Sequence, residues 1–181
     1  APLVYEAFNW EHGVYIGATL ASERTAAQFG KLGEVRRDPM AMLPFCGYNM
    51  ADYFKHWLKM GKRMKKPPRI FHVNWFRTDE NGNFLWPGYG ENLRVLEWVI
   101  HRCRGRVSAV SSPIGYLPRP EDIDLTGLEL PAGTLEKLLA IDRQAWFEEL
   151  EAQRDFFKIF GKRLPPELWK EHRAQLKRLK T

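Results

Sequence analysis

The chain has 181 residues, of which 44% are hydrophobic, so it is long enough to bury a core and form one domain spanning residues 1–181. No apolar run of about 18 residues is present, which excludes a membrane-spanning helix. Residues 1–13 lack the basic-then-apolar order of a secretory signal, so a cytoplasmic location is expected. Neither Cys46 nor Cys103 has a partner at metal-ligand spacing, and both are expected to be reduced packing residues.

Two strands are expected at the start of the chain, in residues 3–10 (LVYEAFNW) and 12–21 (HGVYIGATLA). The second contains the continuous apolar run VYI, which is typical of a strand buried on both faces. Residues 22–39 carry small residues, two glycines and mixed charge without an apolar stripe, so a long loop is expected. Loops of this length are often lids or binding loops, with a disordered crossover as the alternative.

A capped amphipathic helix is expected from Met50, with Asn49 as its N-cap and Gly61 after its end. Its apolar positions are spaced at helical intervals: Met50, Tyr53, Phe54, Trp57 and Leu58. A basic stretch then leads into IFHVNWF at residues 70–76, whose β-branched and aromatic residues favour a strand.

A further helix is expected from Glu91 onward, and it should be largely buried because apolar residues surround much of its circumference. The prolines of residues 107–128 exclude long regular elements there, so an ordered segment that runs across the surface is expected. Residues 130–181 are expected to be helical, with a final helix starting at Pro165 and Pro166. The predicted fold class is mixed α/β: a sheet built from residues 3–10, 12–21 and 70–76, with flanking helices.

The segment Ile70 to Asn92 gathers aromatic residues around a polar turn and continues as GYGEN into a helix. The aromatic residues around the turn are Trp75, Phe76, Phe84, Trp86 and Tyr89. Such a cluster at a strand-to-helix junction is able to hold a flat ring, while backbone groups and an amide side chain contact the ring edges. A packed hairpin without a ligand is the alternative.

Motifs for complete catalytic chemistry are absent from the sequence, which has no GxxxxGK[ST], GxGxxG, HExxH or GxSxG. None of the five histidines has a carboxylate or cysteine at recognised metal-ligand spacing: His12, His56, His72, His101 and His172. The reactive machinery is therefore either missing from the chain or unconventional, and no metal site is indicated.

Several long strings resemble the carboxy-terminal part of GTP-dependent phosphoenolpyruvate carboxykinase, in the family's order and with similar spacing. They are PLVYEAFNWEHGVYIGA, RRDPMAMLPFCGYN, FHVNWF, FLWPGYGENLRVLEW and SPIGYLP, and they extend from Pro2 to about Leu128. The resemblance implies a decarboxylating lyase of gluconeogenesis that converts oxaloacetate and GTP reversibly into phosphoenolpyruvate, GDP and carbon dioxide. It also implies manganese at the active site and magnesium on the nucleotide.

The same resemblance implies that Phe76, Phe84 and Tyr89 hold the guanine ring, with Tyr89 replacing the phenylalanine that the family has at that position. Stacking on aromatic faces contributes about 1 to 3 kcal/mol per base. Backbone groups of Tyr89, Gly90 and Glu91 and the amide of Asn92 resemble the family's guanine-reading set. Trp75 is expected to support the site from behind, with core packing as its alternative role.

The resemblance places a mobile active-site lid at Ser22 to Gly33, and lid closure would exclude water and protect an enolate intermediate. The lid residues are Ser22, Glu23, Arg24, Thr25, Ala26, Ala27, Gln28, Phe29 and Gly30. The manganese ligands, the phosphate-loop lysine and the arginines for oxaloacetate are expected upstream of Ala1. The chain alone is therefore expected to be inactive and to require the missing amino-terminal part of the polypeptide.

Two alternatives remain open. A net charge of +6 and a pI near 9.4, with aromatic residues between basic ones, would also suit a nucleic-acid or nucleotide-binding module without catalysis. That module would bind polynucleotides with steep salt dependence, whereas the carboxykinase resemblance implies a preference for GTP or GDP over ATP. The chain could instead serve only as a folding and docking domain, which predicts an exposed apolar patch over residues 2–18.

Overall fold

The computed structural model describes residues 1–23 and 35–181, and they form a mixed α/β fold with an antiparallel sheet and flanking helices. The chain divides into two compact units. The first comprises residues 1–8 and 69–143, and the second comprises residues 9–68 and 144–181. Within the described residues, no helix is both long enough and apolar enough to cross a membrane.

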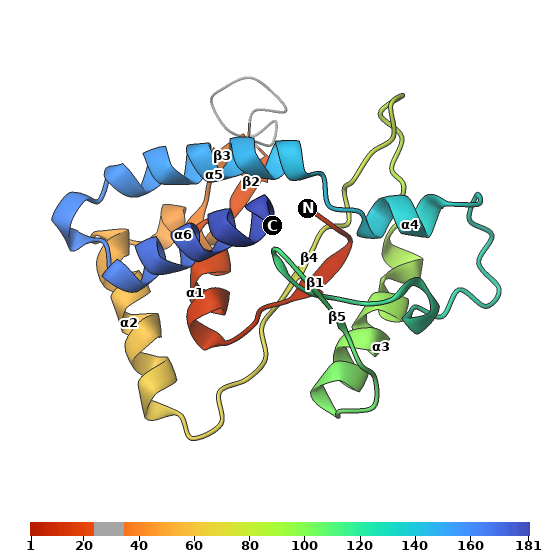
Figure 1. The fold of residues 1–181 in the computed structure, drawn as a ribbon, viewed down its shortest axis with the longest axis horizontal. Helices are drawn as coiled ribbons and strands as arrows, with labels where there is room; N and C mark the ends of the chain where they lie inside the picture. The colour runs from red at the N-terminus through yellow and green to blue at the C-terminus, as the bar shows by residue number, and fades with distance from the viewer. Residues whose placement is uncertain (24–34) are drawn as a thin grey trace. The chain divides into compact units, whose positions relative to one another are not determined.

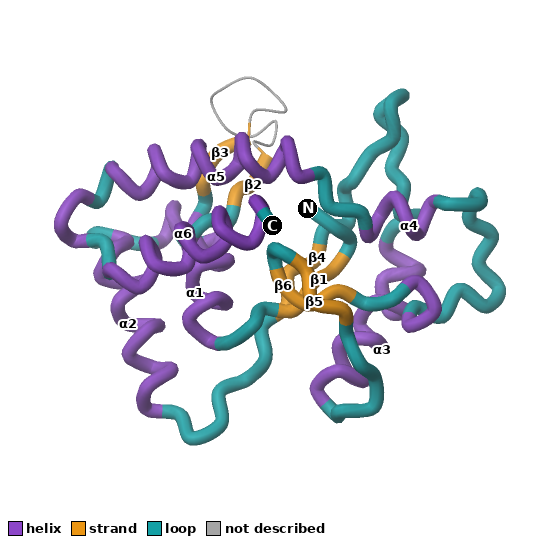
Figure 2. The backbone as a smooth tube through the Cα atoms, viewed as in Figure 1, coloured by secondary structure: helices purple, strands orange, loops and turns teal. Residues whose placement is uncertain are grey.

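The first unit is built on a four-stranded antiparallel sheet with strand order β4-β1-β6-β5 (Figure 2). Its strands are β1 (Val4–Glu6), β4 (Phe71–Val73), β5 (Val110–Ser112) and β6 (Gly115–Leu117). A glycine is required where β6 meets β1, because a Cβ on Gly115 would lie 2.5 Å from the carbonyl oxygen of Glu6. The φ of Gly115, 148°, also disfavours any residue with a side chain.

Two helices and two short 3₁₀ turns complete the first unit: α3 (Asn92–Cys103), α4 (Thr134–Leu139), η3 (Tyr89–Glu91) and η4 (Pro120–Asp122). Val95 and Trp98 of α3 are buried in one core with Leu3, Val4 and Trp86. The expectation that this helix is largely buried is wrong. Only one face packs, and the other leaves three apolar side chains exposed: Leu93, Leu96 and Ile100.

The second unit is mainly helical, and Figure 1 shows its helices α1 (Trp10–Ala18), α2 (Met50–Arg63), α5 (Arg143–Lys158) and α6 (Pro166–Lys180). Its other elements are the paired strands β2 (Ala21–Glu23) and β3 (Val35–Arg37) and the 3₁₀ turns η1 (Pro39–Ala41), η2 (Leu43–Phe45) and η5 (Gly161–Arg163). Helix α1 packs against α2 and α6. The core between them includes Tyr15, Phe54, Phe157 and Leu168, all at most 1% exposed.

The strand predicted for residues 12–21 is wrong, because most of this segment belongs to α1. Asn9 caps the helix, since its Oδ1 accepts a hydrogen bond from the backbone N–H of His12 at 2.9 Å. A continuous apolar run is compatible with either a strand or a buried helix, and here the cap decides between them. The predicted helix at Met50 is confirmed, although Gly61 lies inside α2 and not after it.

The sheet takes its remaining strands from the proline-containing segment, in which only long regular elements were expected to be excluded. Strands β5 and β6 are only three residues each, so the prolines around them do not interrupt them. The strands expected in residues 3–10 and 70–76 are confirmed as the shorter β1 and β4, and the carboxy-terminal helices are confirmed as α4, α5 and α6. The final helix begins at Pro166, as predicted.

Two smaller expectations are also corrected. Cys103 is exposed and does not pack, whereas Cys46 is half-buried against the second core, and both thiols are free. Residues 2–18 are mostly buried, so they do not form the apolar patch that the docking alternative predicts.

Candidate nucleotide-binding site

A tight turn brings the two ends of the aromatic segment together. Thr78 and Phe84 form an antiparallel bridge across it. Inside the turn, Oδ1 of Asp79 accepts hydrogen bonds from the backbone N–H groups of Asn81 and Asn83, both at 2.9 Å. These bonds, that of Asn83 foremost, hold the pKa of the Asp79 carboxyl below its usual value. The ionised carboxylate therefore stabilises the turn that positions the aromatic residues on either side of it.

Phe76 and Phe84 form an exposed aromatic pair next to this turn. Their ring centroids are 6.0 Å apart with an interplanar angle of 63°, which is an edge-to-face contact. The two residues are 71% and 63% exposed. Large aromatic surface left in contact with water is a feature of binding sites. The pair therefore offers a ring face to a planar ligand without any rearrangement of the core.

Tyr89 follows a glycine whose backbone conformation sets the direction of the chain. Gly88 has φ 102° and ψ −154°, a region that residues with a Cβ rarely adopt. The backbone N–H of Glu91 donates to the carbonyl of Gly88 at 3.0 Å, which closes the η3 turn. Tyr89 is consequently 94% exposed, so its ring face is also open.

Some of the groups expected to contact ring edges already form hydrogen bonds or ion pairs within the protein, and others do not. The Glu91 carboxylate pairs with Arg94, with 2.5 Å between Oε2 and Nε, and its backbone N–H is used in the turn. No heavy atom lies within 4 Å of where a Cβ of Gly90 would be, so this backbone is open to a ligand. Oδ1 of Asn92 accepts a hydrogen bond from Nε1 of Trp86 at 2.9 Å.

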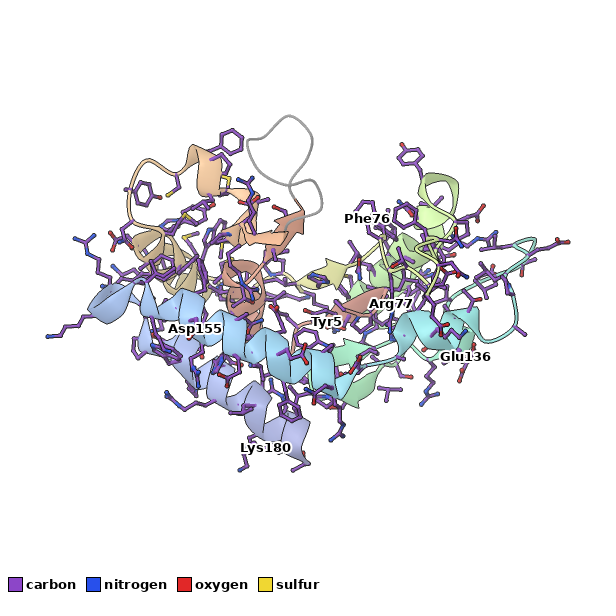
Figure 3. All side chains as sticks on the ribbon, turned by 90° about the horizontal axis from the view of Figure 1, so that it is seen from above. Tyr5, Phe76, Arg77, Glu136, Asp155 and Lys180 are labelled. Atoms are coloured by element: carbon purple, nitrogen blue, oxygen red, sulfur yellow. The ribbon has the colours of Figure 1, made fainter. Side chains whose placement is uncertain are left out.

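Trp75 and Arg77 flank Phe76 in the chain. Trp75 is partly buried and packs against the core of the first unit, which is compatible both with a supporting role and with core packing alone. Arg77, labelled below Phe76 in Figure 3, donates from Nη1 to the carbonyl of Ala140 at 2.8 Å, just after α4. A cavity of about 550 Å³ next to the turn is lined by Arg77, Asp79 and Lys137 among others, and by none of the predicted guanine contacts.

The predicted lid falls mostly outside the described residues. Ser22 and Glu23 belong to β2, and the Ser22 hydroxyl donates to Oδ2 of Asp38 at 3.1 Å. The others, Arg24, Thr25, Ala26, Ala27, Gln28, Phe29 and Gly30, lie in residues 24–34, which the structure does not describe. The lid therefore remains a prediction.

Metal-binding side chains do not converge in residues 1–23 and 35–181: no group of three or more histidine, cysteine, aspartate or glutamate residues could hold an ion there. The described residues therefore do not fit the manganese that the resemblance implies.

Comparison with known proteins agrees with the resemblance in the sequence. Residues 1–178 match the family model described as the phosphoenolpyruvate carboxykinase C-terminal P-loop domain, of the GTP type. The chain belongs to the GTP-type phosphoenolpyruvate carboxykinase family. It is 51% identical over 178 residues to phosphoenolpyruvate carboxykinase [GTP] of Thermoplasma volcanium and 54% identical over 171 residues to that of Chlamydia muridarum.

These matches cover nearly all of this chain but a minor part of the family's enzymes. They span 98% and 94% of the chain, and 30% and 28% of the Thermoplasma and Chlamydia carboxykinases. The enzyme of Anaeromyxobacter dehalogenans is 49% identical over 180 residues, again 30% of its length. The family model is named for a P-loop, yet the 181 residues contain no GxxxxGK[ST] sequence.

The contact between Trp86 and Asn92 is a feature of the candidate site that the sequence pattern does not predict. The sequence places Trp86 only in the aromatic cluster, whereas in the structure it is 1% exposed and belongs to the core. The available signal is the spacing: a tryptophan six residues before an asparagine, across a Pro-Gly turn that reverses the chain.

Proposed function

We propose that the chain is the GTP-binding carboxy-terminal portion of a phosphoenolpyruvate carboxykinase. The complete enzyme converts oxaloacetate and GTP into phosphoenolpyruvate, GDP and carbon dioxide, in gluconeogenesis and in the cytoplasm. Loss of carbon dioxide from oxaloacetate leaves an enolate, whose oxygen accepts the terminal phosphoryl group of GTP. In this division of labour the chain binds the guanine base, and the phosphoryl transfer takes place on residues outside it.

The observation that carries the proposal is the exposed group of three aromatic side chains at one turn and one helix start. Phe76, Phe84 and Tyr89 each expose more than half of their surface, at 71%, 63% and 94%. A purine ring stacked on such faces removes apolar area from water and gains dispersion energy. These residues lie within one unit, so base binding by this group needs no assumption about the other unit.

Recognition of the base edge is assigned to the residues that start α3. Asn92 is the first residue of the helix, and its side chain is half-buried next to the open backbone of Gly90. A buried amide paired with a ring edge discriminates between bases, because the wrong base leaves a polar group unpaired. Tyr89 and Glu91 contribute backbone groups of the same turn.

The remaining parts of the reaction are assigned to residues outside the chain. Without GxxxxGK[ST], the 181 residues lack the usual loop for nucleotide phosphates. Phosphate binding, manganese, magnesium and oxaloacetate binding would then depend on the amino-terminal part of the polypeptide, which is the expected partner of this portion. We therefore expect the chain alone to bind a guanine nucleotide without turning it over.

A competition titration tests the proposal. The 181-residue chain would be titrated with GDP by calorimetry, and bound GDP would then be competed with GTP and with ATP. GTP should displace GDP and ATP should not, and no phosphoenolpyruvate should form from oxaloacetate and GTP. Equal competition by ATP would overturn the assignment of the base site. Turnover by this chain alone would overturn the assignment of phosphoryl transfer to residues outside the chain.

A nucleic-acid-binding module is disfavoured by the pairing of several basic side chains. Arg69 and Arg102 bind the buried carboxylate of Glu6, and Arg37 binds Glu149. Paired arginines are less available for phosphate contacts, which give nucleic-acid binding its salt dependence. Polynucleotide binding that weakens steeply between 50 and about 200 mM salt would favour the module instead.

A further inference from the structure

The indole of Trp86 determines which atom of the Asn92 amide faces it. An indole N–H donates a hydrogen bond and accepts none. The Asn92 atom 2.9 Å from Nε1 of Trp86 must therefore be the carbonyl oxygen Oδ1 and not the amide nitrogen. Because Trp86 is 1% exposed within the core, the indole cannot turn away without disturbing that core.

Because of this contact, the side of the Asn92 amide that faces away from Trp86 offers only hydrogen-bond donors. With Oδ1 directed at the indole, Nδ2 is directed away from it and offers two N–H donors. A free asparagine side chain would offer either a donor or an acceptor by rotating its amide through half a turn. The bond to Trp86 removes the second choice, because the rotated amide would place two donors against each other.

A fixed donor discriminates between two classes of purine. A 6-oxopurine such as guanine or hypoxanthine carries a carbonyl oxygen at position 6, which accepts a hydrogen bond. A 6-aminopurine such as adenine carries an amino group there, which donates. We propose that Trp86 is a positioning residue that holds Asn92 as a donor and thereby makes the site specific for 6-oxopurine nucleotides. This inference rests on the proposed function.

The chain contains a matched control for Trp86. Trp98 is also 1% exposed and belongs to the same core, but its Nε1 has no hydrogen-bond partner among the described residues. Trp98→Phe and Trp86→Phe therefore make the same change in core volume. Only Trp86→Phe removes a hydrogen bond to Asn92.

The test measures dissociation constants for GDP, IDP and ADP by calorimetry on the full chain and on W86F and W98F. W86F should reduce the preference for GDP over ADP, and for IDP over ADP, by at least about tenfold, since the amide becomes free to rotate. W98F should leave both ratios unchanged even if it lowers the melting temperature. IDP isolates position 6, because hypoxanthine lacks the 2-amino group of guanine.

The outcomes separate this inference from the function on which it rests. A wild-type chain with no preference for GDP and IDP over ADP would overturn the proposed function, and this inference with it. A preference that is retained in W86F, or lost equally in W86F and W98F, would overturn this inference alone.

Discussion

Nε of Arg102 lies 2.7 Å from Oε2 of Glu6, and this ion pair connects the last turn of α3 to β1. The other carboxylate oxygen, Oε1, is 2.7 Å from Nη1 of Arg69, just before β4. Glu6 is only 4% exposed, so both arginines compensate a carboxylate that has lost its water. Since Asn92 begins the same helix, this pair fixes the far end of the element that carries the candidate base-reading amide.

Loss of the Glu6 charge should destabilise the first unit. Glu6→Gln keeps the shape but leaves Arg102, whose side chain is 14% exposed, without its counter-charge. Breaking a buried pair in this way costs about 3 kcal/mol or more in the free energy of unfolding. Urea denaturation measures this loss in the free energy of unfolding. Glu151→Gln is the control, because the Glu151–Arg154 pair is largely exposed and should contribute under about 1 kcal/mol. Equal effects of the two substitutions would contradict the prediction.

Removal of either exposed ring should weaken nucleotide binding with little loss of stability. Phe76→Ala or Phe84→Ala removes a stacking face worth about 1 to 3 kcal/mol, so the dissociation constant for GDP should rise about 5- to 150-fold. Both side chains are mostly exposed, so the unfolding free energy should change by under about 0.5 kcal/mol. Ile159→Ala is the control, since Ile159 is 77% exposed on the second unit and should leave GDP binding unchanged. Unaltered affinity in both phenylalanine variants would refute the assigned site.

A methyl group at Gly61 should destabilise the second unit. A Cβ there would lie 2.2 Å from Cδ1 of Trp10, and Trp10 cannot easily move because its Nε1 donates to the carbonyl of Trp57 at 2.8 Å. Although alanine favours helices over glycine, the clash should outweigh that gain, and Gly61→Ala should lower the unfolding free energy by about 1 to 3 kcal/mol. Gly47→Ala, which meets no heavy atom within 4 Å, is the matched control. A melting temperature of G61A equal to that of G47A would show that the helices adjust freely.

The sequence predicts the elements whose local pattern agrees with their environment, such as α2, whose apolar face repeats at helical spacing behind a capping Asn49. It fails for residues 12–21, where an apolar run fits two structures and the cap at Asn9 decides. For the site, the aromatic segment and its turn predict a cluster of rings, and the resemblance to the family selects Phe76, Phe84 and Tyr89 from it. The bond between Trp86 and Asn92 does not, because it depends on how the core holds the indole.

As the pH falls, the chain should begin to lose stability at pH values well above those at which carboxylates titrate. Burial lowers the pKa of His12 to about 3, and the charge of Arg178 acts in the same direction. Burial likewise lowers the pKa of His72 to about 4. Both histidines are thus neutral in the folded chain, while the unfolded chain protonates them near 6.5.

The unfolded state therefore binds more protons below pH 6.5, so the stability that the two neutral histidines contribute is complete above that pH and decreases below it. Each histidine should contribute a slope of about 1.4 kcal/mol per pH unit down to its folded pKa. Urea denaturation between pH 7 and 5 measures the slope before most carboxylates titrate. His72→Phe should remove the contribution of His72 to this slope and leave that of His12, because the two residues belong to different units. An unfolding free energy that is constant from pH 6.5 to 5 would show that both imidazoles accept protons in the folded chain.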